Sequence, residues 1–160
     1  MFVLGIDPGL TRMGYGLVRR ANPPVPVAVG VIRTDSEATT EQRLAELHAD
    51  LAGIIAEHRP DVMAIERVFT NRNLQTAISV GRASGVALLA AAQAGLPVYE
   101  YTPTSVKLAV TGDGSADKRM VQEMVVRRLR LTETPRPADA ADALAIALCH
   151  LQSSVIAAMR

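Results

Sequence analysis

The stretch FVLGIDPGLTRMGYGLVR, residues 2–19, predicts a buried strand that ends in an acidic turn and is followed by a second strand. Residues 2–6 form a short apolar run, which stops at Asp7-Pro8-Gly9, a sequence typical of turns. Residues 15–19 and 25–32 are predicted as two more strands, separated by a turn at Asn22-Pro23-Pro24. Short connections between three early strands predict an antiparallel meander.

The rest of the chain alternates between helical and strand patterns. Apolar residues recur at helical spacing over residues 40–58, with Thr39 or Thr40 as a cap and Arg59-Pro60 as the end. Strands are predicted at 62–65 and 98–101, and further helices at 71–94, 104–110, 116–129 and 138–159. This order predicts one α/β domain over residues 1–160, a mixed five-stranded sheet with helices on both faces.

The helix predicted over 71–94 has a face rich in small residues, which would let another helix approach closely. The face comprises Ala77, Gly81, Ser84, Gly85 and Leu88. Packing within the domain explains it at least as well as a subunit interface, because this spacing is best attested in membranes.

Composition and charge limit the classes of function. Of the 160 residues, 49% are hydrophobic and 21% charged, which is typical of a soluble globular protein. The formal net charge of +1 excludes a strongly basic domain, so DNA binding needs basic residues segregated on the surface. The single cysteine, Cys149, excludes a disulfide framework. We expect no signal peptide and no membrane span, and hence a cytoplasmic protein.

Acidic side chains end two predicted strands and open the last predicted helix. Asp7 ends the first strand and Glu66 follows the apolar run VMAI, so neighbouring strands would project both carboxylates from one edge of the sheet. Asp139 and Asp142 are three residues apart and share a helix face in its predicted first turn. Each acid alone is also explained as a turn cap, a salt-bridge partner or a helix-start charge.

Taken together, the four acids favour metal-dependent chemistry. Four carboxylates in one pocket would repel one another and raise their pKa values, and divalent cations remove that penalty. Mg²⁺ prefers carboxylate oxygens and water, and two such ions about 4 Å apart can promote phosphodiester cleavage. We therefore predict Asp7, Glu66, Asp139 and Asp142 as catalytic metal ligands of a nuclease.

Basic and aromatic residues suggest where a nucleic acid could bind. The only two lysines, Lys107 and Lys118, flank one glycine-containing loop, and Arg119 adjoins the second. Such a cluster can bind phosphates. Phe69 and Arg72 lie in a loop-like stretch after the strand at 62–65. Phe69 is either a core anchor or a wedge that stacks on bases, and its residue type alone favours the core.

A different hypothesis arises from the first turn. The spacing Asp7-x-Gly9-x-x-x-x-Gly14 matches the first phosphate-binding loop of actin-like ATPases and sugar kinases, in which glycines let the backbone approach phosphate. A chain of 160 residues is too short for the two lobes that close over ATP, and no second phosphate loop is evident.

Five stretches, in order, resemble the bacterial RuvC-type Holliday-junction resolvases: GIDPGLTRMGYGLV, AIERVFTNRN, VGRASGVALLAA, PVYEYTPTSVKLAVTGDGSADKRMV and PADAADALAIALCH. The resemblance implies a ribonuclease-H-like fold and a homodimer that resolves four-way DNA junctions in recombination and repair. It implies paired symmetric nicks with 5′-phosphates, and two Mg²⁺ ions, replaceable by Mn²⁺, on the four acids. It also implies action beside a RuvA–RuvB branch-migration complex.

The same resemblance implies roles for individual residues. Lys107 and Lys118 match the family's basic residues at the DNA and the scissile phosphate. Phe69 matches the aromatic residue that stacks at the opened crossover, in place of the core position favoured above. Two alternatives share this fold: a junction-binding module without catalysis, which the presence of all four acids disfavours, and a nuclease acting on RNA, which Phe69 and the loop between the lysines disfavour.

Overall fold

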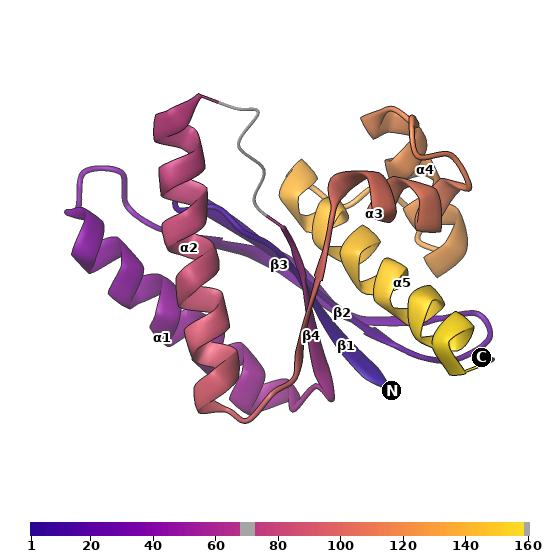
Figure 1. The fold of residues 1–160 in the computed structure, drawn as a ribbon, viewed down its shortest axis with the longest axis horizontal. Helices are drawn as coiled ribbons and strands as arrows, with labels where there is room; N and C mark the ends of the chain where they lie inside the picture. The colour runs from indigo at the N-terminus through magenta and orange to yellow at the C-terminus, as the bar shows by residue number, and fades with distance from the viewer. Residues whose placement is uncertain (68–72, 159–160) are drawn as a thin grey trace.

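Five strands form one mixed sheet in the computed structural model, which describes residues 1–67 and 73–158 (Figure 1). β1 (Phe2–Asp7), β2 (Arg12–Arg19) and β3 (Val25–Arg33) pair antiparallel in sequence order. β4 (Val62–Glu66) pairs parallel with β1, and β5 (Val98–Tyr101) pairs parallel with β4. The strand order β3-β2-β1-β4-β5 confirms the predicted meander and the mixed sheet.

The helices divide between the two faces of the sheet. α1 (Thr40–His58) and α2 (Leu74–Gln93) cover one face. α3 (Pro103–Thr111), α4 (Lys118–Leu129) and α5 (Ala138–Ala158) cover the other (Figure 1). The predicted α/β architecture with helices on both faces is therefore confirmed.

Two helices begin two or three residues later than predicted, because a polar side chain caps each of them there, and α3 begins one residue earlier than predicted, at Pro103. Asp117 accepts a hydrogen bond from the backbone N–H three residues later (2.8 Å), so α4 begins at Lys118 rather than at residue 116. Asn73 accepts one from the N–H two residues later (2.9 Å), so α2 begins at Leu74 rather than at residue 71. Short polar side chains compete for the first free amides of a helix, and this sets where it begins.

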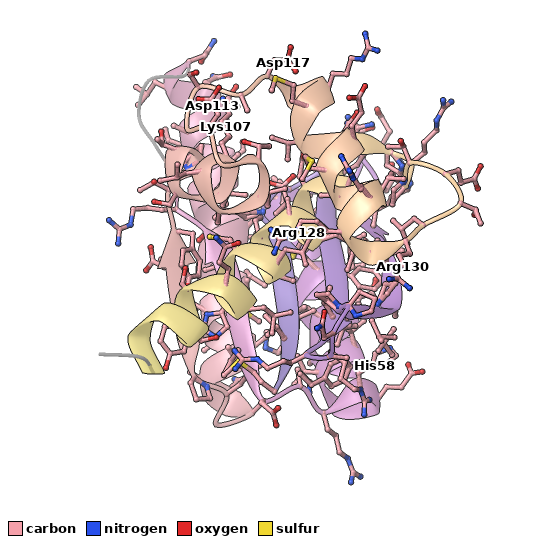
Figure 2. All side chains as sticks on the ribbon, turned by 90° about the vertical axis from the view of Figure 1, so that its right-hand side faces the viewer. His58, Lys107, Asp113, Asp117, Arg128 and Arg130 are labelled. Atoms are coloured by element: carbon pink, nitrogen blue, oxygen red, sulfur yellow. The ribbon has the colours of Figure 1, made fainter. Side chains whose placement is uncertain are left out.

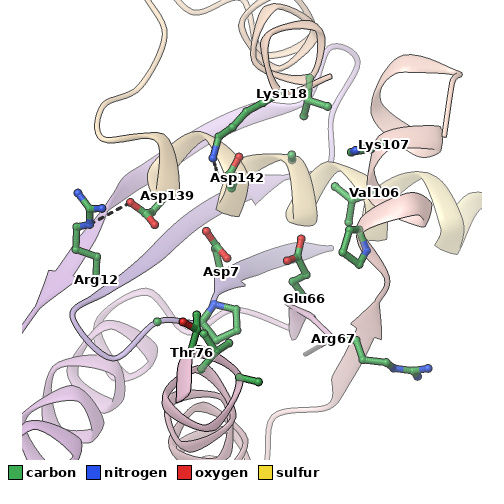
Figure 3. A pocket seen from close by; sticks show the side chains of 17 residues that line it. Asp7, Arg12, Glu66, Arg67, Thr76, Val106, Lys107, Lys118, Asp139 and Asp142 are labelled. Atoms are coloured by element: carbon green, nitrogen blue, oxygen red, sulfur yellow. Dashed lines mark hydrogen bonds and ion pairs between the residues drawn. The ribbon is translucent and has the colours of Figure 1, made fainter. Parts of the chain in front are cut away.

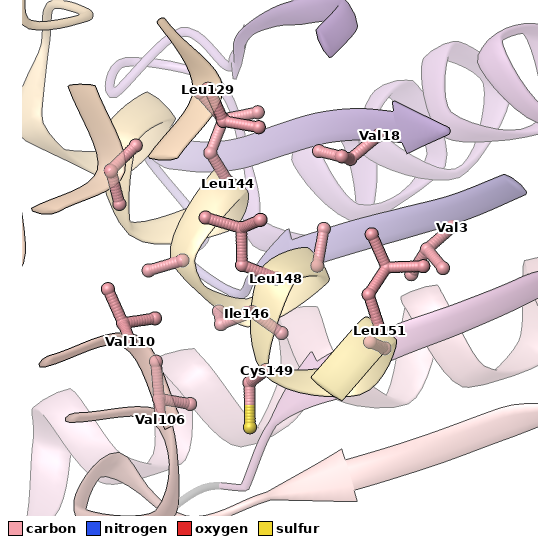
Figure 4. Close-up of a cluster of buried hydrophobic side chains, with 14 of the residues drawn as sticks. Val3, Val18, Val106, Val110, Leu129, Leu144, Ile146, Leu148, Cys149 and Leu151 are labelled. Atoms are coloured by element: carbon pink, nitrogen blue, oxygen red, sulfur yellow. The ribbon is translucent and has the colours of Figure 1, made fainter. Parts of the chain in front are cut away.

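Two hydrophobic clusters hold the helices against the sheet, and neighbouring residues of β1 face opposite ones. Val3 belongs to the cluster with Leu144 and Leu148 of α5 (Figure 4). Leu4 belongs to the cluster on the α1 and α2 side, which includes Leu47. All five side chains are buried, so β1 is covered on both faces, and this explains its uninterrupted apolar run.

Glycines of β1 and β2 face α5 and let its backbone approach the sheet closely. A Cβ atom on Gly5 would come within 2.1 Å of the carbonyl oxygen of Ala143, and one on Gly14 within 2.0 Å of that of Asp139. Such distances are far below van der Waals contact, so neither position tolerates a side chain without movement of the helix. The glycines thereby place the start of α5 beside the end of β1.

α2 packs on one side only. Its buried residues, Ala83, Ala87, Ala90 and Ala91, belong to the same cluster as the buried residues of α1. On the opposite side, Gly81 and Gly85 have open space where a Cβ atom would lie. Packing against the described residues, 1–67 and 73–158, therefore does not explain these two glycines.

Several large apolar side chains are exposed along α2. Leu74 is 74% exposed, Leu89 51% and Ile78 45%. By length and composition α2 also meets the criterion for a membrane span, contrary to the expectation from the sequence, although only 22% of its most apolar window is buried. One such helix is weak evidence for a membrane, because core helices and signal sequences meet the same criterion.

Candidate active site

A cavity of about 530 Å³ lies at the carboxyl ends of β1 and β4. All four predicted acids line it, and Figure 3 shows them directed toward one another from β1, β4 and α5. Lys107 and Lys118 line the same cavity. Seen from the side, Lys107 and Asp113 lie at the opposite end of the molecule from His58 (Figure 2). Residues from separate segments of the chain thus meet at one end of the sheet.

Asp7 and Glu66 reach the cavity as the last residues of neighbouring parallel strands. Ile6 is the register partner of Ile65, so the next residue in each strand carries its carboxylate at the same edge of the sheet. This is the arrangement expected from the sequence. It follows from the parallel pairing, because parallel strands end at the same edge.

Asp139 and Asp142 reach the cavity through the docking of α5. Asp139 lies in the first turn of the helix, whereas Asp142 lies in the second, one turn later than predicted. Gly14, the ladder partner of Asp7, lies against the backbone of Asp139. One glycine therefore links the end of β1 to the start of α5.

The carboxyl group of Asp7 has a pKa of about 8, far above the ordinary value of 3.8. Burial is the largest cause, followed by the negative charges of Asp142, Glu66 and Asp139, while the positive charge of Lys118 opposes the shift. Asp7 therefore keeps its proton at neutral pH unless a cation approaches. The repulsion expected among the four acids is therefore present in the structure, and it is seen in the raised pKa of Asp7.

Each of the two acids on α5 is paired with a cation. Lys118 Nζ donates a hydrogen bond to Asp142 Oδ2 (2.9 Å), and Arg12 Nε lies 3.5 Å from Asp139 Oδ2 (Figure 3). Burial acts to lower the pKa of Lys118, but the hydrogen bond and the nearby carboxylates outweigh it, so the net shift is upward. Lys118 therefore stays protonated and acts as a fixed positive charge in the cavity.

The donor set suits a hard divalent cation. The metal-ligating side chains that line the cavity are carboxylates, with neither histidine nor cysteine among the described lining residues, which favours Mg²⁺ or Mn²⁺ over zinc. In the conformation described for residues 1–67 and 73–158, no three such side chains converge closely enough to hold one ion. Lys118 and Arg12 pair with the Oδ2 atoms of the α5 acids, so these two cations compete with a metal ion for the same carboxylates.

The predicted DNA-contacting residues are distributed unevenly. Lys107 and Lys118 line the cavity, whereas Arg119 is not among its lining residues and donates instead to Glu123 Oε1 (2.8 Å). Phe69 and Arg72 lie outside the described residues. The structure therefore brings both lysines to the acids, but it does not bring Arg119 there.

Arg12 is not among the residues that the sequence singles out. The second strand is predicted to begin at residue 15, which leaves Arg12 in a loop, but β2 begins at Arg12 itself. Had the second strand been predicted to begin directly after the turn at Asp7, its pairing with the first strand would have placed Arg12 near the acids. Thr76, from the first turns of α2, also lines the cavity and carries no signal in the sequence that would have identified it.

Comparison with known proteins adds evidence independent of this geometry. Residues 3–150 match the family model described as Crossover junction endodeoxyribonuclease RuvC. A protein of that description from Salinispora arenicola is 54% identical, with 94% of this chain and 87% of the relative covered. One from Desulfitobacterium hafniense is 53% identical, with 96% and 93% covered.

A solved structure is also similar over nearly the full length. The structure of Thermus thermophilus RuvC in complex with a Holliday junction substrate superposes with a TM-score of 0.93 at 39% identity. The match covers 98% of this chain and 96% of the Thermus chain. The likeness extends to the strands and to the helix that carry the four acids.

Proposed function

The chain belongs to the RuvC family of crossover junction endodeoxyribonucleases, and we propose that it resolves four-way DNA junctions by phosphodiester hydrolysis at the carboxylate cavity. The observation that carries this proposal is the cavity lined by Asp7, Glu66, Asp139 and Asp142, in which mutual repulsion and burial raise the pKa of Asp7 to about 8. Such a site favours a bound divalent cation. The solved relative that binds a Holliday junction supports the substrate.

Nucleases of this family depend on metal ions, and we assign Mg²⁺ at two sites to the four acids, with Mn²⁺ as a substitute. Bound ions of this kind activate a water molecule and stabilise the leaving oxygen of a phosphodiester. Asp7 must release its proton before it can serve as a ligand. Arg12 and Lys118 compete with the ions for Asp139 and Asp142, since each of these acids is paired with one of the two cations in the absence of metal.

Lys118 and Lys107 are proposed to bind the DNA backbone. Lys118 stays protonated among the acids, so it offers a positive charge to the phosphate at the cut and does not accept a proton. Lys107 lines the same cavity from α3, which supports its proposed contact with a neighbouring phosphate. For Phe69, Arg72 and Arg119 the proposed DNA contacts rest on the resemblance to the family, which also favours nicks that leave 5′-phosphates.

A homodimer formed through α2 is the arrangement that we propose for paired cleavage. Exposed residues follow one another along α2 at alternating spacings of four and three, the heptad spacing of a two-helix contact. They are Leu74, Ile78, Gly81, Gly85 and Leu88. A symmetric dimer would cover this face on both copies and bring two cavities to one junction.

The glycines of α2 support a second copy as the occupant. A glycine inside a helix costs about 1 kcal/mol relative to alanine. Open space surrounds Gly81 and Gly85, so packing within the described chain does not require either residue. Two glycines four residues apart let the backbones of two helices approach closely. The dimer also accounts for the apolar face of α2 without a membrane.

Further assignments follow the family pattern. We propose that residues 1–160 act as a single nuclease domain, in the cytoplasm, beside a RuvA–RuvB branch-migration complex. A DNA-acting protein of this family is soluble, which agrees with the proposed location.

A synthetic four-way junction, a linear duplex and an RNA–DNA hybrid of matched sequence test the function with purified protein. We expect symmetric nicks in the junction with Mg²⁺, no cutting with EDTA, and little cutting of the other substrates. Asp7→Asn should abolish cleavage and leave junction binding largely intact, since it removes a ligand and no DNA contact. Undiminished cutting by Asp7→Asn, or preferential cutting of the hybrid, contradicts the proposal.

A further inference from the structure

Arg12 and Arg33 stand directly opposite each other where β2 begins and β3 ends. The backbone N–H of Thr34 donates to the carbonyl oxygen of Thr11 (3.2 Å), so Arg12 and Arg33 form a non-hydrogen-bonded pair of the antiparallel ladder. Side chains of such a pair lie on the same face of the sheet, with Cβ atoms about 4.5–5.5 Å apart. The two arginine side chains therefore leave the same face of the sheet from directly opposite positions, near the end of the edge strand β3.

The charges of this pair are poorly compensated within the described residues. Like charges opposite each other destabilise a sheet. The side chain of Arg33 is exposed and makes no hydrogen bond or ion pair with any residue that the structure describes. Arg12 is 50% exposed and has one ion pair, through Nε, with Asp139. Asp35, which lies two residues after Arg33 and beyond the end of β3, accepts a hydrogen bond from the backbone N–H of Glu37 (2.9 Å). The pair therefore has capacity for an anion from outside the chain.

The backbone beneath the pair is held in place before any ligand arrives. Arg43 donates through Nε to Thr34 Oγ1 (2.9 Å) and through Nη2 to Thr11 Oγ1 (2.8 Å). The buried hydroxyl of Thr34 donates in turn to the carbonyl oxygen of Leu10 (2.6 Å). These bonds tie α1 to the turn after β1 and to the end of β3. A site that is already ordered loses less entropy when it binds.

We propose that Arg12 and Arg33 form a phosphate-binding site for the DNA backbone, beyond the phosphate that is cut. Arg12 borders the cavity on the Asp139 side, whereas Lys118 and Lys107 lie on the other sides of the acids (Figure 3). A strand crossing the cavity would therefore meet cations before and after the acids. Guanidinium groups match phosphate oxygens in geometry, and two adjacent ones can bind one phosphate or two neighbouring ones. This inference rests on the proposed function, because it takes the junction strand as the ligand.

Junction binding as a function of salt tests the site. The probe is a fluorescent four-way junction of synthetic oligonucleotides, titrated by anisotropy in EDTA at several salt concentrations. For Arg33→Gln we expect weaker binding, and the slope of log K against log salt should fall by about 0.9 for each phosphate that the variant no longer neutralises. The slope should fall further in the double variant Arg12→Gln/Arg33→Gln. Arg33→Lys should keep most of the slope, because it keeps the positive charge.

Arg59→Gln is the matched control, because it removes the same charge from an exposed position. Arg59 follows the last residue of α1, His58, which lies at the opposite end of the molecule from Lys107 (Figure 2). The slope of log K against log salt for Arg59→Gln should equal that of the wild type. A wild-type slope in the double variant, with unchanged thermal unfolding, overturns the inference and leaves the proposed function standing. Wild-type protein that does not bind the junction at all counts against the proposed function instead.

Discussion

Gly14 touches the backbone of Asp139 so closely that a Cβ atom on it would lie 2.0 Å from the Asp139 carbonyl oxygen. Gly14 is also the ladder partner of Asp7 on the neighbouring strand. The glycine therefore lets α5 come down onto the sheet at the point where the acids meet. This contact gives Gly14 a role in helix docking, distinct from the role of the corresponding glycine in a nucleotide-binding loop.

Gly14→Ala should displace the start of α5. We expect a loss of about 1–3 kcal/mol in the free energy of unfolding, the usual effect of overpacking. Junction cleavage should fall by roughly a hundredfold, because Asp139 and Asp142 would move away from Asp7 and Glu66. A displacement of about 1 Å in a catalytic group is enough for a loss of that size. Urea denaturation and the cleavage rate measure the two effects.

Gly53→Ala is the control for that substitution. Gly53 is exposed on α1, with open space where its Cβ atom would lie, so the same change should leave cleavage unaltered and stabilise the helix slightly. Equal behaviour of the two variants would show that the contact between Gly14 and Asp139 does not position the site.

The raised pKa of Asp7 predicts a pH-dependent stability in the absence of metal ions. The folded chain holds a proton on Asp7 up to about pH 8, whereas the unfolded chain loses it near the ordinary value of 3.8. The folded state therefore binds more protons between these values, and its stability falls as pH rises through that window.

Asp7→Asn has no proton to lose and should escape this effect. With EDTA present, the variant should be more stable than the wild type by an amount that grows from about pH 4 to pH 8, on the order of 5 kcal/mol at the upper end. Urea denaturation at pH 5, 6.5 and 8 measures the difference. Mg²⁺ should then stabilise the wild type more than the variant, and parallel pH profiles for the two proteins would contradict the assignment.

The two lysines should differ in their effect on metal binding. Lys118 is bonded to Asp142 and its charge acts on Asp7, so Lys118→Gln should strengthen the binding of Mn²⁺ while it weakens cleavage. Lys107→Gln should leave the affinity for Mn²⁺ nearly unchanged and weaken junction binding. Isothermal titration with Mn²⁺ in the absence of DNA measures the first effect. A lower affinity of Lys118→Gln for Mn²⁺ would show that Lys118 does not compete with the metal ion for Asp142.

The exposed glycines of α2 predict how the oligomer can be broken. Gly85→Glu places a charge where a second helix would approach, so we expect a monomer with unchanged secondary structure. Sedimentation equilibrium gives the mass, and circular dichroism gives the helix content. Gly53→Glu, on the exposed side of α1, should remain a dimer. A wild-type protein that is monomeric at micromolar concentration excludes this interface.

Local patterns sufficed for much of the fold. The apolar run before Asp7, the turn at Asn22-Pro23-Pro24 and the helical spacing over residues 40–58 each reflect interactions between near neighbours, and the corresponding elements are observed. Two errors fell where a single side chain sets a helix start, at Asp117 and Asn73, whereas the start of β2 was missed because pairing with β3 extends the strand to Arg12. Element types follow from periodicity, whereas ends depend on individual hydrogen bonds.

The positions of Asp7, Glu66, Asp139 and Asp142 could be foreseen from residue type and place within each element, because strand ends and helix starts are local features. The pairing of Arg12 with Asp139 could not, since it joins residues far apart in the chain. The register that sets Arg12 opposite Arg33 is also a property of the folded sheet. So is the outward direction of Gly81 and Gly85. Residue chemistry can be read along the chain, but contacts between distant residues exist only after strand register and helix docking have brought them together.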